Sequence, residues 1–250
     1  MPILFIFLIG LCIGSFLSVV VFRLDKKAGI LTGHSECPKC LQRIKWYDLF
    51  PVFSYILLKG RCRNCKNKIS PVYILLELVT AFSFISFYIF YKPIFNLADF
   101  YYLTIITSFV VLIFFDYLYF ILPDKVIFPM IAVSFLFDFI FRRSEIISLL
   151  LSALVLSSIF AILYLYSKGE WVGFGDVKLM FLIGLVLGFP LGFLSLLFSI
   201  WSAALVGIVL IILGKANRKT PLPFGTFLSG ISILIIIFQN EIQKIIGQFF

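Results

Sequence analysis

Long apolar stretches recur along the whole sequence and constrain the fold more than any other feature. The chain has 250 residues, of which 62% are hydrophobic, and its mean hydropathy is +1.13. A helix of about 20 apolar residues is long enough to cross the hydrocarbon core of a bilayer. The alternating apolar and polar segments of a membrane β-barrel are absent. The sequence therefore predicts an all-α polytopic membrane protein.

We expect about eight transmembrane helices, whose ends are set by charged, Gly or Pro residues. The sixth is short and rich in Gly, and Pro190 separates it from the seventh. The expected spans are residues 3–22, 72–91, 100–115, 126–141, 146–166, 177–189, 191–213 and 226–238.

The basic residues are distributed unevenly between the two sides of these spans. If the N-terminus is outside, 17 of the Lys and Arg residues lie in or beside cytoplasmic loops and 4 lie on the other side. Such a bias marks the cytoplasmic face. It accounts for the net charge of +9 without a nucleic-acid partner, and none is expected. The 17 are Arg23, Lys26, Lys27, Lys39, Arg43, Lys45, Lys59, Arg61, Arg63, Lys66, Lys68, Lys125, Lys168, Lys178, Lys215, Arg218 and Lys219.

The first cytoplasmic loop, residues 24–71, interrupts the hydrophobic pattern. It contains two CxxC pairs, Cys37 with Cys40 and Cys62 with Cys65, separated by 21 residues. Four thiolates at this spacing suit tetrahedral zinc, and a site closed by four cysteines is structural. Disulfides, a redox pair and an iron–sulfur cluster are the competing interpretations, and the reducing cytoplasm favours zinc. We expect three parts: a first helix at 1–23, this small zinc-binding domain at 24–71, and the remaining spans at 72–250.

Two aspartates stand at the ends of apolar runs, on the side of the membrane that the charges mark as cytoplasmic. Asp116 closes one run, and Asp176 follows Gly173 and Gly175 before another. An ionisable group at a membrane span is costly to keep and indicates function. If the two carboxyls meet, one takes a proton from water and the other donates to a scissile carbonyl. The pair thus suggests an aspartic peptidase.

Other polar residues have simpler interpretations. Asp138 and Arg142 form a helical pair, while Asp99 and Glu145 are expected to cap helices. Asp124 is either the N-cap of the fourth span or a residue with a role beside the active site. His34 cannot by itself form a catalytic triad, and Cys12 is a small hydrophobe within a span. Glu77, inside the second span, either hydrogen-bonds within the bundle or meets a cation such as a sulfonium cofactor or an amine.

Two other classes of function remain open on these features. A transporter with carboxylate sites would need polar residues near the middle of several spans, whereas here the acids gather at one face. A catalytically silent membrane scaffold would use the zinc loop to bind a partner. Shortening of a substrate peptide distinguishes the enzyme from both.

The chain resembles the type IV prepilin peptidases, and the resemblance covers most of its length. The motifs that carry it appear in a specific order along the eight expected spans. They are GSFLSVV at 14–20 with Arg23, the cysteine pairs, WYD at 46–48, Pro51, SY at 54–55, GRC at 60–62, ISPVY at 69–73 with Glu77, Asp116 with LPD at 122–124, GFGDVKL at 173–179 and PFG at 223–225.

The resemblance implies a bifunctional enzyme of the bacterial inner membrane. Asp116 and Asp176 match the family's catalytic pair, which cleaves the leader of prepilins and pseudopilins on the cytoplasmic side. The enzyme then methylates the new N-terminus with S-adenosylmethionine. The loop, with Gly60 and Glu77, is associated with this methyl donor, and the cysteines with zinc. Family members without the zinc loop are peptidases only.

One residue departs from the family pattern. Ser18 stands where the family has Asn, and Ser lacks the paired donor and acceptor of an amide. The peptidase pair is unaffected by this change, so the methyl transfer is the activity it puts in question.

Overall fold

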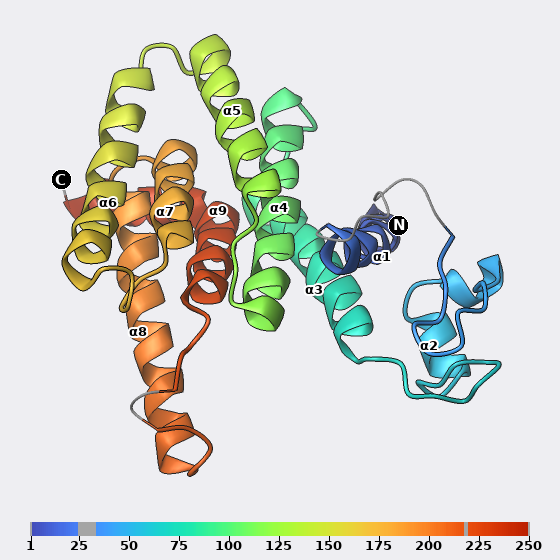
Figure 1. Cartoon of the computed structure of the whole chain (residues 1–250). Helices are drawn as coiled ribbons and strands as arrows, with labels where there is room; N and C mark the ends of the chain where they lie inside the picture. The colour runs from blue at the N-terminus through green and yellow to red at the C-terminus, as the bar shows by residue number, and fades with distance from the viewer. Residues whose placement is uncertain (1, 25–33, 218–219, 250) are drawn as a thin grey trace. The chain divides into compact units, whose positions relative to one another are not determined.

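The computed structural model describes residues 2–24, 34–217 and 220–249, and the chain forms two compact units, Met1–Ile94 and Phe95–Phe250 (Figure 1). Four of the basic residues counted for the orientation, Lys26, Lys27, Arg218 and Lys219, lie outside the described residues. Each unit is built around its own set of packed helices.

The described residues are helical apart from turns and two isolated β-bridges, which confirms the all-α prediction. All eight expected spans coincide with helices. In chain order the elements are α1 (Pro2–Arg23), η1 (Trp46–Leu49), α2 (Phe53–Leu57), α3 (Val72–Ser86), η2 (Phe87–Tyr91), α4 (Leu97–Tyr119), α5 (Asp124–Phe141), α6 (Ile146–Ser167), α7 (Phe174–Leu187), α8 (Leu191–Ile212) and α9 (Phe224–Phe249).

Six helical stretches in the described residues are long and apolar enough to cross a membrane: α1, α3 with η2, α4, α6, α8 and α9. α5 has 18 residues but carries Asp124, Lys125 and Asp138. α7 has 14 residues, which gives a length of about 21 Å, less than the hydrocarbon thickness. It packs against α5, α6, α8 and α9. α7 is thus the central helix of its unit, with most of its residues buried.

In the first unit, α1 and α3 approach each other through small residues. A methyl group on Gly10 would lie 2.6 Å from the Cα of Ala81, and one on Gly14 would lie 2.7 Å from the Cα of Glu77. Glycines four residues apart allow this backbone contact between membrane helices. At the ends of the helices, the rings of Phe22 and Tyr73 stack with their centroids 4.5 Å apart.

The second unit uses the same device around α7. A methyl group on Gly184 would lie 2.4 Å from the Cα of Ala153, so α6 and α7 pack backbone to backbone. Ser195 on α8 and Ser232 on α9 join by a buried hydrogen bond of 2.8 Å. Small and hydroxyl side chains thus replace the hydrophobic effect, which does not drive association between helices in lipid.

The helix ends differ from expectation at three acids and agree at two. Asp99 takes part in a capping box with Asn96, and Asp138 pairs with Arg142 at 3.3 Å, both as predicted. Pro123, not Asp124, occupies the N-cap of α5, and the Glu145 side chain makes no capping hydrogen bond. α4 continues to Tyr119 and ends at Phe120 in the left-handed conformation. Asp116 therefore lies within the last turn of α4 rather than beyond it.

Candidate active site and metal centre

Asp116 is held by the start of α9. The backbone N–H of Thr226 donates to its Oδ2 at 2.7 Å, and the Thr226 hydroxyl lies 3.2 Å from the same atom. A helix N-terminus presents free N–H groups and a partial positive charge, both of which favour a carboxylate there. Gly225 allows this approach, since a methyl group on it would lie 3.1 Å from Asp116 Oδ2.

Asp176 lies at the start of α7. Its Oδ2 accepts the backbone N–H of Gly173 at 3.2 Å, which closes the first turn of the helix. The side chain is half-buried. Asp176 therefore has a capping role, but its single hydrogen bond leaves capacity for further partners.

The two carboxyls belong to one site. Leu122 lies against both adjacent glycines: a methyl group on Gly175 would be 3.0 Å from its Cβ, and one on Gly225 would be 3.0 Å from its Cδ1. The N-termini of α7 and α9 and the C-terminus of α4 thus converge around Leu122.

A second ion pair supports the start of α7. Lys178, two residues after Asp176, binds Asp124 at the start of α5. The ammonium group also lies 5.1 Å from the ring centroid of Phe174 and 5.4 Å from that of Phe128. Asp124 is thus a partner of Lys178 rather than the predicted N-cap, and it ties α5 to the segment that carries Asp176.

The four cysteines of the loop come together as the spacing predicts. The sulfur atoms of Cys37, Cys40, Cys62 and Cys65 all lie within 4.8 Å of one another. The sulfurs of Cys37 and Cys65 are 3.8 Å apart, too far for a disulfide. Four sulfurs at about 2.3 Å from a tetrahedral zinc ion would be separated by about 3.8 Å. The donor set and its dimensions fit zinc.

The two cysteine pairs sit in equivalent turns. Each is closed by one antiparallel bridge, Glu36 with Arg43 and Arg61 with Lys68. The residue after the second cysteine is left-handed in both, with φ of 55° at Leu41 and 58° at Lys66. The same backbone hydrogen bond closes each turn, from Leu41 N–H to the Cys37 carbonyl and from Lys66 N–H to the Cys62 carbonyl.

The environments of the thiols shift their pKa values in opposite directions. Hydrogen bonds from the backbone of Cys40 and Lys39 lower the pKa of Cys37 to about 6. At Cys65 a hydrogen bond from the Asn67 backbone lowers the pKa, but desolvation and the neighbouring cysteines outweigh it and raise the pKa to about 11. Four thiolates in one place thus need a metal cation to offset their repulsion.

Asp48 and Arg63 clamp the loop beside the second cysteine pair. Arg63 donates from Nε at 2.9 Å and from Nη2 at 2.6 Å to the two carboxylate oxygens. These hydrogen bonds from Arg63 hold the pKa of Asp48 below its ordinary value. Because that pKa is depressed in the folded state, the clamp stabilises the loop at neutral pH and is lost on strong acidification.

Gly60 and Glu77 have structural roles in the first unit. Gly60 has a φ of 65°, and a methyl group on it would lie 3.0 Å from the Tyr55 hydroxyl. The Glu77 Oε2 atom accepts the backbone N–H of Val52 at 2.8 Å, and Ser15 also hydrogen-bonds to Glu77. Glu77 is therefore the internally hydrogen-bonded carboxyl that was one of the two sequence interpretations.

Ser18, the departure from the family motif, is buried in α1. Its hydroxyl donates to the carbonyl of Ser15, one turn earlier in the same helix, at 2.6 Å. The shorter side chain thus satisfies itself locally. His34 contributes its backbone carbonyl to Arg23 at 2.8 Å.

Sequence reasoning missed Thr226 and the partner of Lys178. Thr226 is the third residue of α9 and follows Pro-Phe-Gly at 223–225. A hydroxyl residue after a turn and before an apolar run is a signal for a helix start. The contact between Asp116 and Thr226 joins residues 110 positions apart, and no local pattern predicts it.

These observations define a class: a helical membrane protein with paired carboxyls at helix ends and a four-cysteine loop. Comparison with protein families identifies it further. Residues 8–91 match the bacterial peptidase A24 N-terminal domain, and residues 102–208 match the type IV leader peptidase family. The first stretch contains all four loop cysteines, and the second contains Asp116 and Asp176. The chain belongs to the type IV leader peptidase family.

Curated relatives match along nearly the whole chain. Proteins named prepilin leader peptidase/N-methyltransferase are 29% identical in Aeromonas salmonicida, over 96% of this chain and 91% of the relative. The protein of that name in Pseudomonas aeruginosa is 28% identical, over 97% and 92%. The one in Bacillus subtilis is 29% identical, over 97% and 96%. No solved structure matches the chain.

Proposed function

We propose that this protein cleaves the leader peptides of prepilins or pseudopilins and then methylates the new N-terminus. The peptidase step rests on Asp116 and Asp176. The observation that carries it is the convergence of the two carboxyls around Leu122. Gly175 lies beside Asp176 and Gly225 beside Asp116, and the absence of side chains there leaves room for the backbone of a substrate peptide. Curated relatives that match nearly the whole chain carry both activities in their name.

The two carboxyls provide general acid–base catalysis. In the ground state the pair holds one proton, because two close carboxyls do not ionise together easily. The ionised member takes a proton from water as the water oxygen attacks the scissile carbonyl carbon. The other member donates its proton to the carbonyl oxygen. Collapse of the tetrahedral intermediate then breaks the C–N bond, and the amine leaves with a proton.

Thr226 positions one half of this pair. The Thr226 N–H donates to Oδ2 of Asp116 at 2.7 Å, and the Thr226 hydroxyl lies 3.2 Å from both that oxygen and the Ile113 carbonyl oxygen. These contacts orient Asp116 and leave its other oxygen for water or substrate. The Lys178 and Asp124 ion pair does the corresponding work for α7 by anchoring the residues next to Asp176. Catalytic groups held by such supporting contacts need little reorganisation during the reaction.

The site faces the cytoplasm in this proposal. The uneven distribution of Lys and Arg in the sequence supports that orientation, and the protein is a multi-pass protein of the inner membrane. An apolar pilin helix in the bilayer would place its leader at the membrane surface, where the two carboxyls meet water. The scissile segment must be extended to expose its carbonyl.

The first unit carries the methyl-transfer half in this proposal. Cys37, Cys40, Cys62 and Cys65 would hold a structural zinc ion that keeps the loop folded. S-adenosylmethionine, when bound, supplies an electrophilic methyl group to the neutral amine. We assign Gly60 and Glu77 to the region that receives it, because both shape the loop between the cysteines and α3. The functional parts remain residues 1–23, 24–71 and 72–250.

Mass spectrometry of a prepilin-like substrate tests both halves at once. The purified protein in nanodiscs is incubated with the substrate and S-adenosylmethionine. The expected product has lost its leader and gained the mass of one methyl group. A product without the methyl group would assign the chain to the peptidase-only members. An intact substrate would refute the enzyme and favour a carboxylate-dependent transporter or a scaffold.

A further inference from the structure

A row of exposed apolar side chains runs along η1 and α2 in the first unit. Trp46, Phe50, Phe53 and Leu57 are 73%, 54%, 62% and 80% exposed. Trp46 begins η1, Phe50 is the C-cap of η1, and Phe53 and Leu57 are the first and last residues of α2. A soluble domain does not normally expose so many large apolar side chains together. We call these four residues the apolar row.

The attachment of the row to α3 determines its depth in the membrane. Val52, between Phe50 and Phe53, donates its backbone N–H to Glu77 at 2.8 Å. Glu77 is the sixth residue of α3, a helix that continues as a membrane span to Tyr91. At 1.5 Å per residue, it lies about 7.5 Å along the helix axis from Val72. The turn that carries the row therefore lies level with the first turns of a membrane helix.

The turn at Val52 is held in an unusual conformation. Val52 has φ of 62° and ψ of −50°, and Phe53 donates its N–H to Pro51 at 2.6 Å. This is a γ-turn with positive φ, which is rare and strained, above all for a β-branched residue. Strain of this kind persists where surrounding contacts over-determine it, and the Glu77 carboxylate is such a contact.

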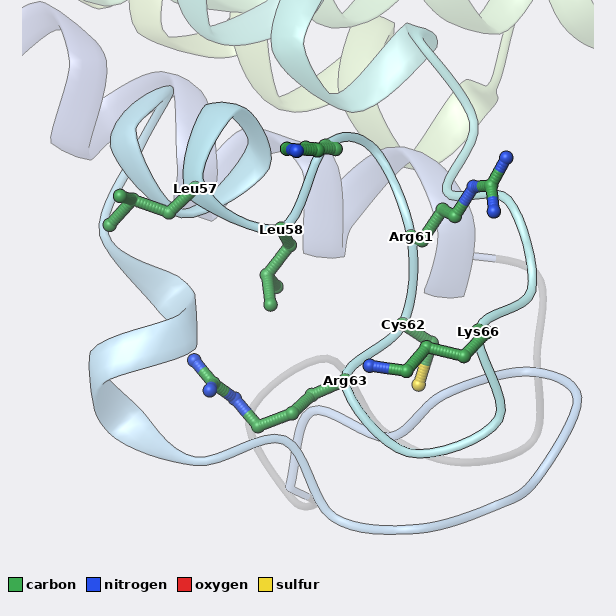
Figure 2. Close-up of a pocket in the computed structure, with 7 residues that line it drawn as sticks. Leu57, Leu58, Arg61, Cys62, Arg63 and Lys66 are labelled. Carbon is green, nitrogen blue, oxygen red and sulfur yellow. The ribbon is translucent and has the colours of Figure 1, made fainter.

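A basic pocket opens at the end of the row. It has a volume of about 580 Å³, and Leu57, Leu58, Lys59, Arg61, Cys62, Arg63 and Lys66 line it. Figure 2 shows Arg63 and Lys66 on either side of the space below Leu58. Arg63 is already paired with Asp48. In the described part of the chain, no acid pairs with Lys59, Arg61 or Lys66. The pocket thus joins apolar walls to three cations that no carboxylate of the described residues pairs, beside Cys62 of the cysteine cluster.

We propose that η1 and α2 form an interfacial docking element that binds anionic phospholipid. The apolar row enters the boundary between headgroups and acyl chains, and a lipid phosphate lies among Lys59, Arg61 and Lys66. An apolar face with Trp and Phe beside Lys and Arg is the composition of segments that lie in this boundary. Because both ends of the loop join membrane spans, the element need not find the bilayer by diffusion.

Fluorescence quenching by brominated lipids tests this in the intact protein. Trp171 and Trp201 are replaced by Phe, which leaves Trp46 as the reporter. The protein is placed in nanodiscs of phosphatidylglycerol or phosphatidylcholine. We expect strong quenching of Trp46 in phosphatidylglycerol, more by bromine near the headgroup than by bromine near the chain end. The zinc content of each sample confirms that the loop is folded.

Two matched charge variants locate the headgroup. Replacement of Lys59, Arg61 and Lys66 by Gln should lower the quenching to about half or less, because each cation near an anionic surface favours docking roughly fivefold. The control, Lys39, Arg43 and Lys68 to Gln, removes the same charges from the same loop outside the pocket and should change little.

Three results would overturn the proposal. Trp46 emission that is insensitive to bromine would mean that the row lies in water or is covered by residues 95–250. Equal quenching of Trp46 in phosphatidylcholine and phosphatidylglycerol would show that the pocket does not bind an anionic headgroup. An equal loss of Trp46 quenching in both charge variants would show that the net charge of the loop, and not the pocket, causes the effect.

Discussion

The two units build their sites from different kinds of structure. In residues 95–250, Asp116 and Asp176 are placed by the ends of long helices, and hydrogen bonds at those ends orient them. In residues 1–94, the cysteine pairs lie on turns that contain residues with positive φ, one pair before η1 and the other after α2, and Gly60 follows α2. The first arrangement depends on the packing of apolar helices. The second lies on a few strained turns, and its four-sulfur donor set fits a metal ion.

This difference predicts that the two sites fail separately. Helix ends are supported by the whole bundle, so a change of one carboxyl removes chemistry but leaves the fold. The loop has little apolar core of its own, and small domains of this size need a metal to stay folded. Loss of the metal should therefore unfold the loop and leave the bundle intact.

The largest expected effect is the loss of cleavage in Asp116→Asn and in Asp176→Asn. Each substitution keeps the shape of the side chain but removes one member of the acid–base pair. Cleavage of a prepilin, measured by mass spectrometry, should fall by about 1,000-fold or more, while the zinc content stays unchanged. Glu170→Gln, an exposed acid close to Asp176 in sequence, is the control. Normal cleavage by either variant would refute the catalytic pair.

Removal of one cysteine should produce the opposite pattern. Cys62→Ser leaves three thiolates, so zinc affinity and methylation should both fall by about tenfold or more. Cleavage by the carboxyl pair should persist. Zinc is measured by mass spectrometry of the metal, and methylation on a substrate that has already been cleaved. Cys12→Ser, outside the cluster, should retain both. A wild-type protein without zinc would contradict the assignment.

A smaller effect is expected from the support of Asp116. Thr226→Val removes the hydroxyl that binds Oδ2 but keeps the backbone N–H and the shape. A hydrogen bond to a charged group is worth about 1.5–3 kcal/mol, so the rate of cleavage should fall about 10- to 100-fold. Thr226→Ser, which keeps the hydroxyl, should restore most of it. Equal rates for Ser and Val would show that the hydroxyl does not matter.

The smallest effect concerns the backbone of the loop. Gly60→Ala places a methyl group at positive φ and against Tyr55. The left-handed conformation alone costs about 1–2 kcal/mol, and zinc should exchange from the loop several times faster. Gly214→Ala is a matched control, because Gly214 has a similar φ of 67° but nothing within 4 Å. Unchanged zinc exchange in Gly60→Ala would mean that the turn adapts to the methyl group.

Much of this arrangement could be predicted from local patterns. The CxxC spacing placed all four thiols in one cluster. Apolar runs located the long helices, but α9 continues to Phe249, 11 residues beyond the expected end at 238. Asp116 and Asp176 stood out because charge is rare at membrane spans. The partners of these acids could not be predicted, because Thr226 and Asp124 reach their sites through helix packing across long sequence separations. Asp124 was predicted to be the N-cap of its helix because Asp is a common N-cap residue and Pro123, the actual N-cap, has no side chain that can accept a hydrogen bond.

The close contact of α1 with α3 determines how the metal acts on the loop. The aromatic rings of Phe22, near the end of α1, and Tyr73, at the start of α3, stack on each other. Helix packing therefore holds the two ends of the connecting loop close together. The loss of chain entropy on closing the loop then accompanies helix packing and not zinc binding. A zinc ion would then only join the two cysteine turns within a loop whose ends are already close together. A bulky residue at Gly14, which would push the helices apart, should therefore weaken zinc binding from within the membrane, without touching a ligand.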